Sequence, residues 1–135
     1  MNHFVRLFCS ALVVAGLTFT ACKKDHPTPH FSPRTIHYQL HTDQDFSDDE
    51  HTITFRLHMH AGNNVVFDSA LAPMLIKEIP DKAHQLIFDK LVPAGFDRDT
   101  LVVGFVYEIK NVGVSWFLDT CAPGQARKIV DYNFR

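Results

Sequence analysis

The chain has 135 residues, of which 46% are hydrophobic and 21% are charged. A chain of this length can form one domain with its own hydrophobic core, because such a domain buries about two-thirds of the surface that it exposes when unfolded. The formal net charge is −2, so the chain has no excess of basic residues with which to bind nucleic acid or anionic lipid. The composition therefore argues against nucleic-acid binding and against a polybasic membrane-surface module.

Residues 1–21 have the parts of a secretory signal peptide. One charged side chain, Arg6, precedes an uncharged apolar run at residues 7–19. This run is shorter than the roughly 20 residues that a membrane span needs, and it suits the hydrophobic region of a signal peptide. Small residues follow, and then Cys22. An ordinary signal peptide with a chance cysteine behind it, and an uncleaved hydrophobic anchor, are the alternatives.

Residues 19–22 (FTAC) resemble the lipobox of bacterial lipoproteins, although Phe19 stands where Leu or Val is usual. Residues 23–25 (KKD) resemble the charged start of many Bacteroidota lipoproteins that reside in the outer membrane, facing the periplasm or the cell surface. The resemblance implies cleavage before Cys22 and lipid, including palmitate, on its thiol. Two or three acyl chains hold a protein almost permanently on a membrane, whereas one binds marginally. From residue 35 onward the sequence is similar to small uncharacterised lipoproteins of this type in its overall pattern, and no active site comes with that resemblance.

The mature chain would begin with a tether. Residues 22–34 contain three prolines among polar residues, which predicts a semi-extended linker after the lipidated cysteine. Cys9 would leave with the signal peptide and Cys22 would carry lipid, so Cys121 is the remaining thiol. We expect no internal disulfide in the domain, and we expect Cys121 to be buried and unreactive.

From residue 35 onward the hydrophobic residues alternate with polar ones. Residues 35–42 and 51–60 each have one apolar and one polar face, which predicts strands with one wet side. Residues 101–109 are apolar on both faces at their start, which is typical of a central strand. No helical stretch of convincing length is present. We therefore predict an all-β domain at residues 35–135, an antiparallel β-sandwich, immunoglobulin-like or similar, with seven to eight strands. The remaining candidate strands are residues 65–67, 74–79, 84–92, 114–118 and 128–134.

Histidines recur on the polar faces of two predicted strands. His37 and His41 share a face of the first strand, and His58 and His60 share a face of the second. Imidazole is a ligand for zinc, copper or nickel, so pairing of the two strands would create a divalent-metal site. The alternative is that any water-tolerant residue would serve at these positions.

The segment between these strands is rich in carboxylates, namely Asp43, Asp45, Asp48, Asp49 and Glu50. Oxygen-rich loops of this kind can bind calcium. Asp48, however, stands where the calcium loop of a helix–loop–helix site has its glycine, so a solvated loop is the alternative.

The sequence contains no nucleophile-elbow or phosphate-loop motif, and we expect no enzymatic activity. Tyr107 and Trp116 are candidates for an aromatic platform that binds a sugar or a peptide, unless they belong to the core. The sequence thus leads to three hypotheses. The first is a membrane-anchored, non-catalytic interaction or accessory module that contacts other envelope proteins. The others are a divalent-metal-binding lipoprotein and a carbohydrate-binding lipoprotein.

Overall fold

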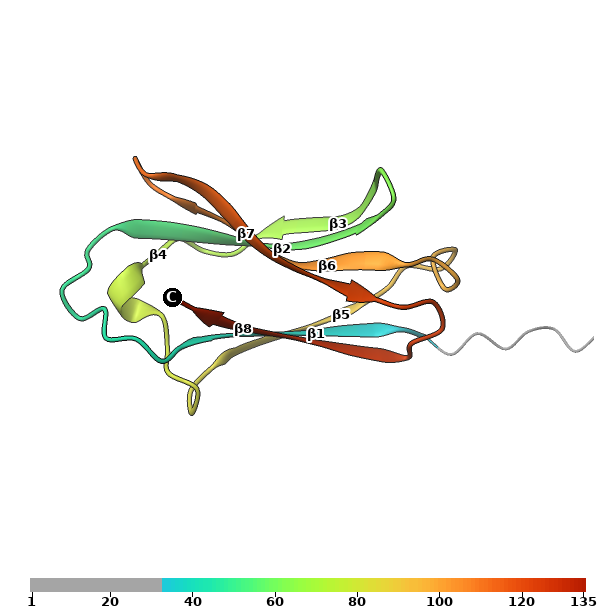
Figure 1. The fold of residues 1–135 in the computed structure, drawn as a ribbon, viewed down its shortest axis with the longest axis horizontal. Helices are drawn as coiled ribbons and strands as arrows, with labels where there is room; N and C mark the ends of the chain where they lie inside the picture. Colours follow the sequence, from blue (N-terminus) through green and yellow to red (C-terminus); the bar gives the residue numbers. More distant parts are fainter. Residues whose placement is uncertain (1–32) are drawn as a thin grey trace, which may run out of the picture. The chain divides into compact units, whose positions relative to one another are not determined.

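The computed structural model describes residues 33–135, which form a β-sandwich of eight strands (Figure 1). The predicted fold class is confirmed. Alternation of apolar and polar residues explains most of the strands, because every second side chain of a strand points to the same face of its sheet. The elements are β1 (Thr35–Thr42), β2 (Thr52–Ala61), β3 (Asn64–Ala70), β4 (Met74–Leu75), a 3-10 helix η1 (Ile76–Glu78), β5 (Leu86–Leu91), β6 (Leu101–Ile109), β7 (Gly113–Cys121) and β8 (Arg127–Phe134).

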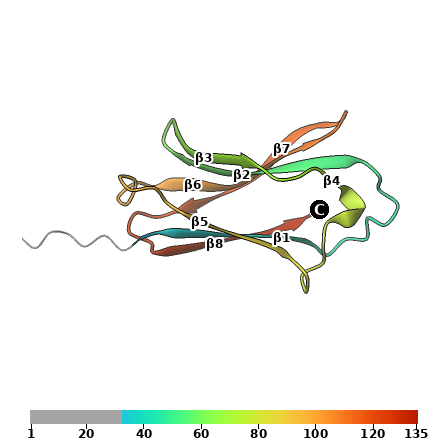
Figure 2. The same ribbon diagram turned by 180° about the vertical axis from the view of Figure 1, so that it is seen from behind.

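The strands form two sheets, which lie as two layers in Figures 1 and 2. The smaller sheet has the order β5-β1-β8, and the larger has the order β3-β2-β6-β7 with β4 paired to β2. The pairing is antiparallel except between β1 and β8, which run parallel from Thr35 opposite Arg127 to Thr42 opposite Phe134. The first and last strands of the domain are therefore neighbours, a departure from the purely antiparallel pattern that the sequence predicts.

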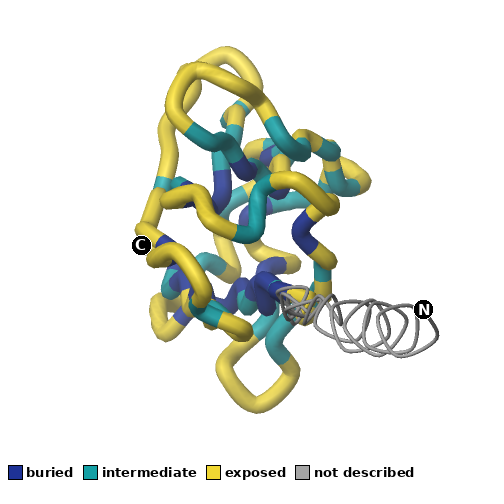
Figure 3. The backbone as a smooth tube through the Cα atoms, turned by 90° about the vertical axis from the view of Figure 1, so that its right-hand side faces the viewer, coloured by how far each residue is buried: buried dark blue, intermediate teal, exposed yellow. Residues whose placement is uncertain are grey.

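The core fills the space between the two layers. On β1, Ile36, Tyr38 and Leu40 are completely buried. The inward residues of β2 and the first three inward residues of β6, which are Leu101, Val103 and Phe105, are buried to the same degree. The hydroxyl of Tyr38 donates a hydrogen bond to the backbone carbonyl of His58 at 3.0 Å, which links the two sheets through the core. Burial raises the pKa of Tyr38. Figure 3 shows the buried segments inside the domain and the exposed segments in its turns.

Aromatic residues, among them Phe55, Phe105 and Tyr38, make up much of this core. Phe55 and Phe105 contact edge to face, with ring centroids 6.2 Å apart. Phe117 of β7 stacks on Tyr132 of β8 at 4.7 Å, and the carboxylate of Asp119 pairs with Lys128 at 2.5 Å. These two contacts join the edge strands of the two sheets, so the core is covered along that side.

Arg34, which the sequence assigns to the tether, contributes its side chain to the domain. Only 1% of the residue is exposed. Its guanidinium donates to the carbonyl oxygens of Phe96 at 2.7 Å, Asp99 at 2.9 Å and Ala122 at 2.8 Å, and it lies 3.1 Å from the sulfur of Cys121. Arginine suits this position because its rigid fork carries five N–H donors. One side chain thus joins the start of β1 to the β5–β6 and β7–β8 connections.

The strand β7 passes very close to Gly104 of β6. A Cβ atom at this position would overlap the backbone carbonyl of Phe117. Glycine is therefore required where β6 and β7 approach each other most closely. Beyond this point β7 runs obliquely toward the start of β8 (Figure 1).

Candidate functional site on the outer face of the larger sheet

The four candidate histidines do not converge, because β1 and β2 belong to different sheets. Each histidine of β1 instead has an aspartate of a neighbouring strand. His37 lies 2.6 Å from Asp89 of β5, and His41 lies 2.9 Å from Asp131 of β8. Both histidines are more than nine-tenths buried. Their prediction as one four-histidine metal site is therefore wrong, since the strand pairing that it required does not form.

The two histidines of β2 remain together on the outer face of the larger sheet. Nε2 of His58 lies 3.1 Å from Nδ1 of His60. The other ring nitrogen of His58 lies 3.3 Å from a carboxylate oxygen of Asp68 on β3, and Arg56 pairs with that same carboxylate at 2.6 Å. The result is a continuous polar network of four side chains, Arg56, Asp68, His58 and His60.

A bulge in the strand pairing accompanies this network. Met59 pairs with Phe67, whereas the next residue of β2, His60, pairs with Val65, so Val66 of β3 is the extra residue. Bulges of this kind change the direction of nearby side chains and often lie next to sites. The sequence pattern showed the His58–His60 spacing but not Asp68, because nothing in one sequence reveals a shift in register.

The other half of the same face is apolar. Val114, Trp116 and Leu118 occupy successive outward positions of β7 and are 60%, 67% and 37% exposed. In the strand register Trp116 lies opposite Val106 of β6, which lies opposite Arg56 of β2. One sheet face thus combines the apolar row of β7, with Glu108 of β6 beside Val114, and the His–Asp–Arg network on β2 and β3.

Tyr107 and Trp116 do not form one platform. Tyr107 pairs in register with Ser115, whereas Trp116 pairs with Val106, so the two aromatic side chains lie on opposite faces of the sheet. Tyr107 packs inside, with its ring 5.6 Å from Phe55 and 6.0 Å from Tyr132. Trp116 alone is available to a ligand, and the two-residue platform predicted from the sequence is wrong for that reason.

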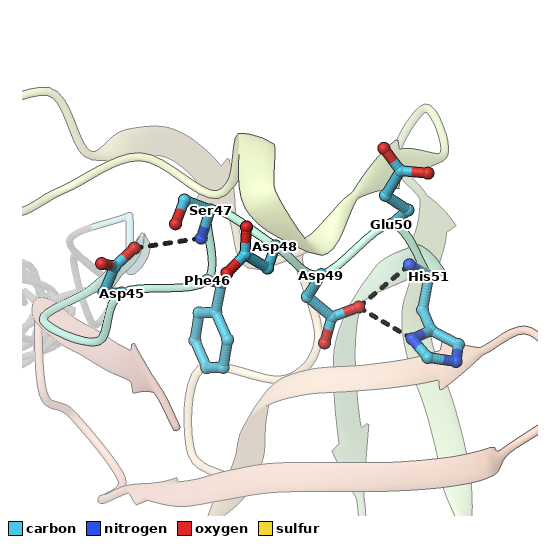
Figure 4. A pocket seen from close by; sticks show the side chains of 7 residues that line it. All are labelled: Asp45, Phe46, Ser47, Asp48, Asp49, Glu50 and His51. Carbon is cyan, nitrogen blue, oxygen red and sulfur yellow. Dashed lines mark hydrogen bonds and ion pairs between the residues drawn. The ribbon is translucent and has the colours of Figure 1, made fainter.

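The acidic loop forms an open depression lined by residues 45–51 (Figure 4). Its carboxylates stabilise the loop itself. Asp45 accepts a hydrogen bond from the backbone N–H of Ser47 at 3.0 Å, and Asp49 accepts one from the backbone N–H of His51 at 2.9 Å. These hydrogen bonds hold the pKa of both carboxyl groups below the ordinary value.

The remaining candidate calcium ligands point elsewhere. Glu50 pairs with Lys77 at 2.9 Å, and Asp43 accepts a hydrogen bond from Gln44 at 3.2 Å. In Figure 4 the carboxylates of Asp45, Asp48, Asp49 and Glu50 point in different directions. Within residues 33–135 no three His, Cys, Asp or Glu side chains are grouped as ligands for one metal ion. The geometry is that of a loop stabilised by its own carboxylates.

Comparison with known proteins adds no relative. No protein-family model, curated protein or solved structure matches the chain.

Cys121 is a buried free thiol, as the sequence predicts, whereas Cys22 and the signal peptide lie outside the described residues. Residues 33–135 contain no helix that is long and apolar enough to span a membrane.

Proposed function

We propose that the protein is a non-catalytic interaction module of the cell envelope, anchored through lipid on Cys22, which recruits a protein partner along β7. The single observation that carries the interaction role is the exposed apolar row Val114, Trp116 and Leu118 on an edge strand. The anchor rests on the signal-peptide pattern and on the lipobox resemblance of residues 19–22. The partner is another envelope protein that supplies an extended, apolar segment.

The edge strands β3, β5, β7 and β8 differ in how they are protected. Charged side chains and short length normally prevent an edge strand from pairing with another chain. The edge strand β5 has six residues and includes Asp89 and Lys90, and β8 begins with Arg127 and Lys128. The third, β3, has seven residues and includes Asp68.

β7 lacks that protection. It has nine residues, and its one charged side chain, Asp119, is paired with Lys128 of the same chain. Among the described residues, β7 pairs with β6 alone. Its other edge therefore presents backbone N–H and C=O groups that an extended strand satisfies. Apolar side chains of the incoming strand would cover Trp116 and its neighbours. For this reason we propose an extended apolar segment as the partner.

The exposed apolar residues of the smaller sheet serve as the contrast. Leu91, Ile87 and Ile129 are at least half exposed. Each shares its row across the sheet with a charged residue: Leu91 with Arg127, Ile87 with Asp131 and Ile129 with Asp89. They are isolated apolar residues on a polar face, which soluble domains commonly have. Charged residues also lie in the rows of the β7 residues, since Val114 pairs with Glu108 and Trp116 shares its row with Arg56. The difference is that three successive outward positions of β7 are apolar and exposed, whereas on β5 Asp89 separates Ile87 from Leu91.

Charge substitutions on the two sheets test the proposal. Affinity purification of the full chain from detergent-solubilised membranes should recover one constant envelope protein, which Leu118→Lys removes and Ile87→Lys retains. Protection of an extended segment of that partner against proteolysis in the complex would identify the incoming strand. Retention of the partner by Leu118→Lys, or recovery of a second copy of this chain instead, would contradict the proposed occupant.

The anchor has its own test. Metabolic labelling with a clickable palmitate analogue should tag the wild type and fail to tag a Cys22→Ala variant. Equal labelling of both proteins, or of neither, would contradict lipidation at Cys22. Because this assay reads the thiol alone, it can fail while the partner assay succeeds, and the two parts of the proposal are judged separately.

A further inference from the structure

We propose that His58 and His60 form a two-nitrogen chelating site for one Cu(II) ion on the outer face of the larger sheet, with Asp68 as the group that orients His58. This site differs from the four-histidine arrangement that the sequence suggested. It needs no strand from the other sheet, and it is independent of partner recruitment by β7.

The separation of the two nitrogens fits a shared metal ion. Nε2 of His58 and Nδ1 of His60 lie 3.1 Å apart. Two imidazole nitrogens that each bind one ion at about 2.0–2.1 Å, with an angle of about 90–110° at the metal, lie about 2.9–3.4 Å from each other. A metal ion can therefore bind both nitrogens at their present separation, provided that it displaces the proton between them and both rings turn so that their lone pairs point at the ion.

Asp68 fixes the form of His58 that binding requires. Its carboxylate lies 3.3 Å from Nδ1 of His58. When this nitrogen carries the proton and donates it to Asp68, Nε2 presents its lone pair to His60. Histidines that bind metals usually donate their other N–H to a carboxylate in this way. Arg56 pairs with Asp68 at 2.6 Å and holds the carboxylate in place.

The surroundings leave room for further ligands. His58 lies opposite Gly104 in the strand register, so no side chain stands beside it on β6. The side chain of His58 is 17% exposed, and water can supply the remaining ligands of the ion. A site with two imidazoles and water oxygens suits the tetragonal geometry of Cu(II), which also binds such ligands more strongly than Ni(II) or Zn(II).

The single tryptophan of the chain provides the readout. Trp116 lies two strands away from β2 on the same face, which places its backbone about 10 Å from that of β2. Bound Cu(II) should therefore quench its fluorescence. Titration of the full chain in detergent with Cu(II) should give saturable quenching with one ion per chain, and electron paramagnetic resonance should show two imidazole nitrogens.

Variants decide whether these histidines bind the ion. His58→Gln and His60→Gln should each weaken the affinity about tenfold or more and remove one nitrogen from the resonance spectrum, whereas His84→Gln, on an exposed loop, should behave as wild type. Asp68→Asn should weaken binding about 10–100-fold while two nitrogens remain. Circular dichroism checks that each variant is folded. Wild-type quenching and an unchanged spectrum in folded His58→Gln would overturn the proposal.

Discussion

The guanidinium of Arg34 lies 2.7 Å from the backbone carbonyl oxygen of Phe96, 62 residues further along the chain. The same side chain reaches Ala122 at 2.8 Å, so it connects three segments at one end of the sandwich. Under the proposed anchoring, the lipid is attached twelve residues before Arg34 in the sequence. The contact therefore defines the position at which the anchored part of the chain joins the folded domain.

Loss of this side chain should destabilise the domain strongly. Arg34→Met keeps the apolar stem but leaves the carbonyls of Phe96, Asp99 and Ala122 without their donor. Each buried polar group that loses its partner costs about 1–3 kcal/mol, so we expect a loss of about 3 kcal/mol or more in urea unfolding. Arg127→Met, at an exposed arginine, is the control and should change stability by less than about 0.5 kcal/mol. A small effect of Arg34→Met would show that water replaces the guanidinium.

Gly104→Ala should disrupt the pairing of β6 and β7. The added methyl group would overlap the carbonyl of Phe117, which belongs to backbone and cannot rotate away. We expect a loss of more than about 2 kcal/mol, in the range of overpacked cores. Gly62→Ala is the comparison, because Gly62 has a φ of +55° and open space around it. Gly62→Ala should lower the free energy of unfolding by only about 1 kcal/mol, because alanine disfavours the left-handed backbone conformation. Equal effects in chemical unfolding would contradict the close approach.

Truncation of two adjacent aromatic residues of β7 should change the stability of the domain to very different extents. Phe117 stacks on Tyr132 at 4.7 Å, so Phe117→Ala should reduce the free energy of unfolding by about 2 kcal/mol. Trp116 is 67% exposed on the other face, so Trp116→Ala should change it by less than about 0.5 kcal/mol. Thermal or urea unfolding of the two variants measures the difference. A large loss for Trp116→Ala would mean that this side chain supports the fold rather than a partner.

Acid should weaken the loop at residues 43–50 by protonating carboxylates that accept its hydrogen bonds. The backbone N–H of His51 holds the pKa of Asp49 below its ordinary value of 3.8. Because the folded-state pKa is lowered, the stabilisation is fully present above the unfolded-state value and is lost as the pH falls through the folded-state value. Asp49→Asn should therefore flatten the dependence of the thermal midpoint on pH below about 4. Carboxyl titration by NMR checks the sign, and a pKa of Asp49 above 3.8 would contradict it.

Alternation in the sequence predicts the strands well and their partners poorly. Residues 35–42 and 101–109 were predicted as strands and form β1 and β6, because period-two burial is a local property. Residues 74–79 form a two-residue strand followed by a 3-10 helix. The parallel pairing of β1 with β8 joins residues about 90 positions apart, and no local pattern specifies such a pairing.

Predicting the candidate sites requires knowledge of strand pairing, whereas predicting the strands themselves requires only the local alternation of residues. His37 and His41 required β1 beside β2, yet the two strands lie in different sheets. The alternation at residues 101–109 and 114–118 puts Tyr107 and Trp116 on opposite faces only when the register is known. Arg34 could not be assigned to the core either, since its partners are backbone carbonyls of distant loops. The residue types in the sequence indicate which ligands each site could bind. Which of these residues lie close together depends on long-range strand pairing, which the sequence does not reveal.

The most direct test of the account is photo-crosslinking from position 116 in intact membranes. A photoreactive phenylalanine analogue in place of Trp116 should give one discrete adduct with an envelope protein, mapped to an extended apolar segment of that partner. The same analogue in place of Ile87, on the other sheet, should give none. Adducts of equal yield from both positions, or an adduct at position 116 with a second copy of this chain, would contradict recruitment of a partner strand by β7.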